Sequence, residues 1–199
     1  MTATDVLTFW FGAWDDALPL PDDDPQTRRW WAREPDVDRA IQDRFGALHT
    51  ELVHEGWREW SDSPEELLAC VIVIDQFSRV IYRGQKQAFA HDGRARSLTR
   101  RALDLGWPAS LAPIQRTFLY MPLVHAEDRE SHALADTLFS GVAREVEETA
   151  RFSYYQRVLD DVAKHREIID RFGRYPRRNI VLERTSTPEE LAWLDGGAA

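Results

Sequence analysis

Residues 63–84 decide the fold, and they read Ser-Pro-Glu-Glu-Leu-Leu-Ala-Cys-Val-Ile-Val-Ile-Asp-Gln-Phe-Ser-Arg-Val-Ile-Tyr-Arg-Gly. The stretch opens with a helix start signal. Ser63 supplies a capping hydroxyl, Pro64 suits the first helical position, and Glu66 is placed to close a capping box. We therefore predict a helix from Pro64 to about Tyr82. Its first half is apolar throughout, so the helix is expected to lie at the centre of the molecule.

Charged side chains interrupt this apolar pattern in the second half of the helix. Asp75, Arg79 and Arg83 follow one another at four-residue steps, which places them on one face. Because the helix is expected to be central, these charges should be partly enclosed, and buried guanidinium groups need carboxylates or anionic ligands. Two interpretations stay open: a structural ion ladder, and a face that binds an anion.

Helical patterns also account for most of the remaining chain. Apolar periodicity and start signals predict helices over residues 6–11, 37–54, 88–105, 113–122, 128–142, 150–172 and 188–193. The helix from Pro113 is expected to end or kink at Pro122, which leaves His125 at a bend. No alternating strand of useful length is present. The pattern is typical of an all-α fold of stacked antiparallel helix pairs.

The 199 residues are expected to form a single helical domain, residues 1–199. One irregular stretch, residues 12–26, holds five aspartates and three prolines. It is predicted to be an extended acidic loop, either a plain surface loop or a lid. The tail, residues 196–199, is predicted to fray.

Charge and cysteine content narrow the classes of function. The formal net charge of -9 disfavours nonspecific binding to nucleic acid or to an anionic membrane, because both depend on clustered positive charge. Cys70 is the only cysteine, so no intramolecular disulfide can form, and its apolar neighbours indicate a buried, inert thiol. The first residues carry no basic segment typical of a secretion signal. These features predict a cytoplasmic protein.

Two histidines lie in later segments that also mix polar with apolar residues. His165 falls on the apolar stripe of its helix and is expected to face inward, either as a core histidine with a fixed partner or as a proton-transfer residue. His125 has similar surroundings. Asp75 or Glu127 could orient either ring, although an acidic residue at a helix start has a structural explanation as well. The predicted catalytic residues are His125, Glu127, His165 and Asp75.

Positive charge gathers near the end of the helix that carries His165. Some of these arginines can interact with the last carbonyls of that helix, but guanidinium groups also match carboxylates and phosphates. The predicted ligand-binding residues are Gln76, Arg79, Arg83, Arg116, Arg171, Arg174, Arg178 and Asn179.

Motifs for metals and cofactors are missing from the sequence. It has no His-Glu-x-x-His pattern, no cysteine cluster, no calcium-loop spacing, no glycine-rich phosphate loop and no Gly-x-Ser-x-Gly turn. We therefore predict no metal and no cofactor, and nucleotide hydrolysis and serine-esterase chemistry have no support.

The polar segments together resemble the bacterial domain-of-unknown-function family 924, over nearly the whole chain. The resemblance is carried by Phe9-Trp10-Phe11-Gly12, Asp75-Gln76-Phe77 with Arg79, Tyr82-Arg83-Gly84, Ala88-Phe89, Phe118-Leu119-Tyr120-Met121-Pro122-Leu123 with His125 and Glu127-Asp128, residues 165–179, and Ser186-Thr187-Pro188-Glu189-Glu190. It implies an all-helical fold similar to tetratricopeptide repeats, and it implies no established activity. Ser78, Val80 and Arg177 depart from the usual family pattern.

Three interpretations of function follow. The first is a pocket that binds a small anionic molecule, with His–carboxylate acid–base chemistry as a further step. The second is a tetratricopeptide-like module that binds a peptide or protein without catalysis, for which Trp57, Trp60 and Trp107 would have to be accessible. The third is a purely structural role for the polar residues.

Overall fold

The computed structural model describes residues 1–21, 24–31, 33–54, 60 and 62–196, and every regular element in these ranges is a helix. The elements are α1 (Ala3–Phe11), α2 (Pro25–Trp31), α3 (Pro35–His54), α4 (Pro64–Val71), η2 (Ile72–Phe77), α5 (Ser78–Ile81), η3 (Lys86–Phe89), α6 (Asp92–Asp104), η4 (Trp107–Ser110), α7 (Pro113–Val124), α8 (Arg129–Glu145), α9 (Phe152–Phe172), η5 (Pro176–Arg178) and α10 (Pro188–Asp195). The predicted all-α class is confirmed. The likeness to tetratricopeptide repeats stays a prediction.

The central helix forms as its sequence predicts. Ser63 accepts a hydrogen bond from the Glu66 amide, and α4, η2 and α5 then continue to Ile81. The middle segment, η2, is a π-helix, in which each turn holds more residues than in an α-helix. All of residues 67–74 are buried, so this helix lies inside the molecule as expected.

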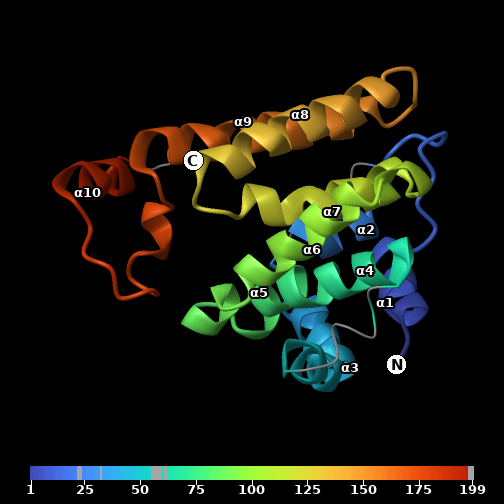
Figure 1. The fold of residues 1–199 in the computed structure, drawn as a ribbon, viewed down its shortest axis with the longest axis horizontal. Coiled ribbons are helices and arrows are strands. Elements are labelled where there is room, and N and C mark those ends of the chain that lie inside the picture. Colours follow the sequence, from blue (N-terminus) through green and yellow to red (C-terminus); the bar gives the residue numbers. More distant parts are fainter. Residues whose placement is uncertain (22–23, 32, 55–59, 61, 197–199) are drawn as a thin grey trace.

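Two layers of helices cover the central helix. α1, α3 and α6 pack against the central helix, and α7 packs against α4 and α6. α8 packs against α7 and against α9, and the three helices follow one another through short connections (Figure 1). This succession places the ends of α7 and α9 near the C-terminal segment that carries η5.

Aromatic rings join the layers. Trp10 of α1 contacts the rings of Phe77 and Phe118 at centroid distances of 5.4 Å, and Trp30 of α2 lies 4.9 Å from Phe118. Burial of such rings contributes a large part of the hydrophobic stabilisation. α2 begins at Pro25, at the end of the stretch expected to be irregular, because Asp24 caps it by accepting from the amides of Gln26 and Thr27.

Two helix ends differ from the prediction. α7 continues past Pro122 to Val124, so the proline lies in the last turn and His125 is the residue that caps the helix. The helix predicted over residues 88–105 is a short 3₁₀ turn, η3, followed by α6, which begins only at Asp92.

Within the described ranges, no helix has both the length and the apolar character needed to cross a membrane.

Candidate functional site

A carboxylate and a histidine form the centre of the candidate site. Asp75 lies in the π-helical segment η2, and its side chain is completely buried. Its Oδ1 lies 2.9 Å from Nδ1 of His125 at the end of α7, and its Oδ2 accepts a hydrogen bond from Gln76 at 2.6 Å. π-helical turns are frequent at functional sites because they change which side chains face a neighbouring helix.

Electrostatics assign the protons of this pair. Burial raises the pKa of Asp75, but the opposing effects of Arg79 and His125 outweigh it and hold that pKa well below the usual value. Burial and the nearby Arg79 lower the pKa of His125. At neutral pH, Asp75 is therefore a carboxylate and His125 is neutral. Since a carboxylate only accepts, Nδ1 of His125 carries the proton and Nε2 carries the lone pair.

The backbone around His125 is held by three side chains. The hydroxyl of Tyr175 donates to the carbonyl of Val124, Arg178 donates to the carbonyl of His125 at 3.1 Å, and His132 donates to the carbonyl of Ala126 at 2.9 Å. Carbonyls at the end of a helix have no partner within the helix. These contacts satisfy them and fix the position of the imidazole.

Arginine and aspartate side chains beside the pair neutralise one another. Arg79 binds Asp92 through two hydrogen bonds of 2.9 and 3.1 Å and lies 3.4 Å from Asp75. Arg178 contacts the same Asp92 at 3.2 Å. Two guanidinium groups thus face two carboxylates, so this cluster supplies no excess positive charge for an anionic ligand.

One residue predicted to be catalytic, Glu127, and two predicted to bind a ligand, Arg174 and Asn179, anchor the C-terminal segment. Glu127 accepts from Arg184 and from the amide of Tyr175, so it does not orient His125. Arg174 holds Glu190 through two hydrogen bonds of 2.6 and 2.7 Å, and Asn179 donates to the same carboxylate at 3.2 Å.

Three other predicted arginines pair away from His125. Arg83 follows the end of α5 and binds Asp38 of α3, so it leaves the expected ladder with Asp75 and Arg79. Arg116 lies near the start of α7 and pairs with Glu145, and Arg171 pairs with Glu189. None of these three arginines lines either of the two cavities that His125 lines.

His165 lies near His125 but forms a different bond. Its Nδ1 is 2.7 Å from the carbonyl of Asp161, one turn earlier in α9, and so donates to it. Its ring meets the ring of Tyr175 edge-on, at a centroid distance of 5.8 Å. Neither Nε2 of His165 nor Nε2 of His125 has a hydrogen-bond partner within the described part of the chain.

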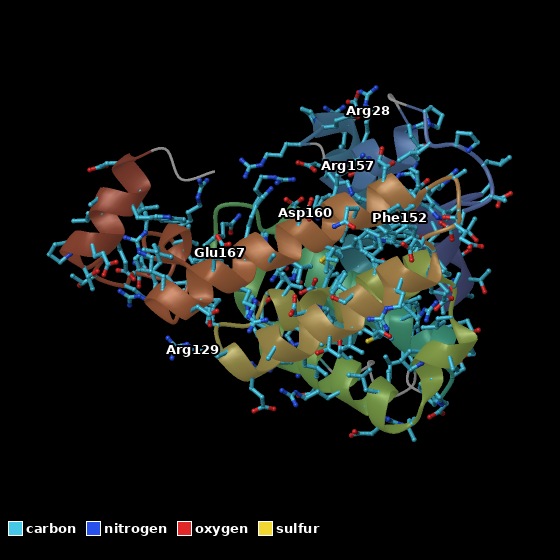
Figure 2. The ribbon with its side chains drawn as sticks, turned by 90° about the horizontal axis from the view of Figure 1, so that it is seen from above. Arg28, Arg129, Phe152, Arg157, Asp160 and Glu167 are labelled. Atoms are coloured by element: carbon cyan, nitrogen blue, oxygen red, sulfur yellow. The ribbon has the colours of Figure 1, made fainter. Side chains whose placement is uncertain are left out.

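A cavity of about 690 Å³ lies beside the two histidines. Its lining comes from the loop before α2, from α2, from α7 and from α9: Pro19, Leu20, Pro21, Thr27, Trp31, Met121, Val124, His125, Ala150, Ser153, Tyr154, Arg157, Val158, Asp161, Val162 and His165. Figure 2 shows Arg157 on α9 next to the N-terminal segments. The size is that of a small-molecule site, and the lining presents polar and apolar surface in similar amounts. A smaller cavity of about 270 Å³ lies on the other side of His125, beside Asp92 and Arg178.

Sequence reasoning missed several members of this site. Asp92 occupies the first turn of α6, where an acidic residue is too common to indicate a site. Tyr175 acts through a backbone carbonyl of α7, which lies far from it in sequence, and His132 bonds the carbonyl of Ala126 in the turn just before its own helix. Arg157 lies on the helix that carries His165, two turns before it. This spacing places both residues on one face, and it was the one sequence feature that could have linked Arg157 to the site.

Of the tryptophans considered for a peptide groove, Trp60 and Trp107 are half-buried and pack against the core. Trp57 lies outside the described residues.

Within the described part of the chain, no group of three or more His, Cys, Asp or Glu side chains is arranged to hold a metal ion.

A family model and a solved structure match nearly the whole chain. The model of a family described as bacterial protein of unknown function (DUF924) matches residues 6–198. A solved structure of a protein of unknown function from Agrobacterium tumefaciens is similar, with a TM-score of 0.79 and 29% sequence identity, over 98% of this chain and 97% of that chain. None of the curated proteins matches.

Proposed function

Because this chain belongs to the bacterial DUF924 family, whose function is unknown, we propose an activity from its own geometry: it binds a small molecule in the larger cavity, and His125 acts there as a general base. The observation that carries this proposal is the bond between Nδ1 of His125 and the buried carboxylate of Asp75. A carboxylate in this position fixes the tautomer and leaves Nε2 as the basic atom.

Burial and charge support the same role. A base works best when it is unprotonated at the working pH, and the lowered pKa of His125 keeps the ring neutral at pH 7. With Nδ1 turned to Asp75, Nε2 is the nitrogen that a molecule in the cavity would meet. General-base catalysis of this kind contributes about 10²–10⁴-fold to a rate.

The type of step is a direct proton transfer. Among the described residues, no serine, threonine or cysteine side chain is hydrogen-bonded to His125, which favours removal of a proton from the bound molecule, or from a water that attacks it, over a covalent intermediate. The proton that Nε2 of His125 takes up is returned from the same atom to the product or to solvent, and His165 lies at the same end of the cavity. Arg79 keeps Asp75 ionised, and Asp92 pairs with Arg79, so neither is assigned a contact with the substrate.

An anionic ligand remains part of this proposal, but the predicted arginines do not carry it. Each of the six that were predicted is paired with a carboxylate: Arg79, Arg83, Arg116, Arg171, Arg174 and Arg178. The alternative of a peptide-binding module has less support, because Trp60 and Trp107 pack against the core rather than form an exposed groove.

Turnover of unlabelled metabolites tests the proposal. The wild-type protein and the variants His125→Asn and His54→Asn are incubated with a mixture of bacterial small molecules, and consumption is followed by mass spectrometry. Asparagine keeps a donor near the place of Nδ1, and His54, at the end of α3, is the matched control. We expect compounds that wild type and His54→Asn consume and His125→Asn does not. Equal consumption by His125→Asn, or no consumption by wild type, would contradict the proposal.

A further inference from the structure

The larger cavity has its polar groups along one edge. α9 contributes a row of side chains at four-residue steps, which lie above one another on one face of a helix. This row consists of Ser153, Arg157, Asp161 and His165. A molecule in the cavity would therefore meet polar groups along the side formed by this row.

The rest of the lining is mainly apolar. The neighbouring row of α9 and the facing part of α7 supply buried side chains: Tyr154, Val158, Val162, Met121 and Val124. Trp31 of α2 also lines the cavity, and it is 49% exposed although its ring stacks on Phe118 at 5.8 Å. An exposed indole beside an apolar floor offers a surface on which an apolar or aromatic group can pack.

The lining carries one positive and one negative side chain, and among the described residues only the negative one is paired. Asp161 is the one carboxylate of the lining, and its Oδ1 lies 2.8 Å from Nζ of Lys164. Arg157 is the one arginine or lysine of the lining, and it has no carboxylate partner within the residues that the structure describes. Arg157, which is exposed, thus offers the cavity a guanidinium that is not held in an ion pair among the described residues, whereas Asp161 is engaged by Lys164.

The positive charge and the histidines lie at different places along α9. Arg157 and His165 are eight residues apart, about 12 Å along a helix. Tyr175 contacts the ring of His165 and bonds the carbonyl of Val124, next to His125, so both histidines lie at the same end. A molecule that reaches Arg157 and His125 together must be elongated.

We propose that the cavity binds an elongated, mainly apolar monocarboxylate, with its carboxylate at Arg157, its body against Trp31 and the apolar floor, and its far end at His125. A guanidinium fork matches a carboxylate with two parallel hydrogen bonds, and Arg157 is the one guanidinium of the lining. This proposal names the substrate class of the proposed function and rests on it only for the role of His125. Binding itself requires no turnover.

Binding of a matched pair of probes tests the assignment. The affinities of 5-phenylvalerate and its neutral amide, 5-phenylvaleramide, are measured by titration calorimetry and by tryptophan fluorescence. We expect wild type to bind the carboxylate more tightly, and Arg157→Gln to weaken it about five- to tenfold while leaving the amide unchanged. Arg166→Gln is the matched control, because Arg166 lies on the same helix and pairs with Asp136 instead of lining the cavity.

Four outcomes of the binding experiment would overturn the assignment of a carboxylate to Arg157. Equal affinity for carboxylate and amide, no binding of either probe at millimolar concentration, or an equal loss in Arg157→Gln and Arg166→Gln would each do so. Tighter binding of the matching phosphate monoester would also contradict the assignment, because the cavity would then prefer a more highly charged group than a carboxylate. His125→Asn separates the two proposals: intact binding without turnover supports both, whereas intact binding with unchanged turnover contradicts only the role of His125.

Discussion

His125 is fixed through its ring and through the peptide groups on both sides of it. Asp75 holds Nδ1, while Tyr175, Arg178 and His132 bond three successive carbonyls. A side chain held in this way needs no rearrangement when a substrate arrives, which is how binding and catalytic groups are preorganised. Asp75 could be identified from the sequence as a charge in an apolar helix, and Arg178 as one of a group of arginines, whereas the bonds from Tyr175, Arg178 and His132 to the backbone could not be predicted.

Replacing Tyr175 by phenylalanine tests this arrangement. The variant loses the bond to the buried carbonyl of Val124 but keeps the ring that packs on His165, so we expect the free energy of unfolding to fall by about 1–2 kcal/mol. We also expect turnover to fall while the affinity for 5-phenylvalerate stays the same, because Tyr175 positions His125 and does not line the larger cavity. Unchanged turnover would show that the bond does not position His125.

The central helix and the C-terminal segment bring the site together. The π-helical segment η2 places Asp75 toward α7, and the following turn, α5, places Arg79 near Asp92 of α6. The segment from Tyr175 to α10 closes the site from the other side and is held by buried Glu190 and by Glu127. Sequence patterns predicted α10 from its capping box, but they assigned Arg174 and Asn179 to a ligand because the partner carboxylate lies more than a helical turn away in sequence.

Replacing Glu190 by glutamine tests how far the C-terminal segment supports the site. The hydrogen bond from Arg174, together with the amide of Thr187, lowers the pKa of Glu190 to about 2, so the carboxylate is bound in its charged form. In Glu190→Gln we expect faster amide hydrogen exchange over residues 175–196 and a melting temperature lower by several degrees. Glu189→Gln, which removes only an exposed pair with Arg171, is the control. Equal exchange in both variants would contradict a supporting role for this segment.

The molecule is an all-helical fold in which the central helix carries the buried carboxylate Asp75. Its class and most helix positions could be predicted, because apolar periodicity and caps such as Ser63 and Thr187 are local signals. The π-helical segment and the cavity could not, since both depend on how helices distant in sequence pack. The arginines were assigned to an anion for the same reason: sequence shows a positive charge but not the carboxylate that meets it, and only Arg157 lines the larger cavity.

Acid should destabilise the molecule through its buried histidines. Burial, and then the neighbouring His91, lower the pKa of His49 to about 4, and burial also lowers the pKa values of His91, His125 and His132. Histidines in the unfolded chain have an ordinary pKa of about 6.5, so below that pH the unfolded chain binds more protons than the folded chain. The free energy of unfolding therefore falls as the pH drops from there toward 4. His49 alone contributes about 3 kcal/mol to this loss by pH 4.

Thermal unfolding between pH 7.5 and 5 measures this effect. We expect the melting temperature to fall across this range, and to fall less in a His49→Gln variant, whose side chain does not titrate. A melting temperature that stays constant from pH 7.5 to 5 would show that the histidines are not held neutral in the folded protein.

The protonation state of His125 tests the central claim most directly. Long-range proton–nitrogen NMR spectra of the imidazole distinguish a protonated Nδ1 from a protonated Nε2. We predict the tautomer with the proton on Nδ1 at pH 7, an apparent pKa below 6.5, and loss of the preference for this tautomer in Asp75→Asn, because an amide can donate to the ring as well as accept from it. A proton on Nε2, or a doubly protonated ring at pH 7, would contradict the role of His125 as the base.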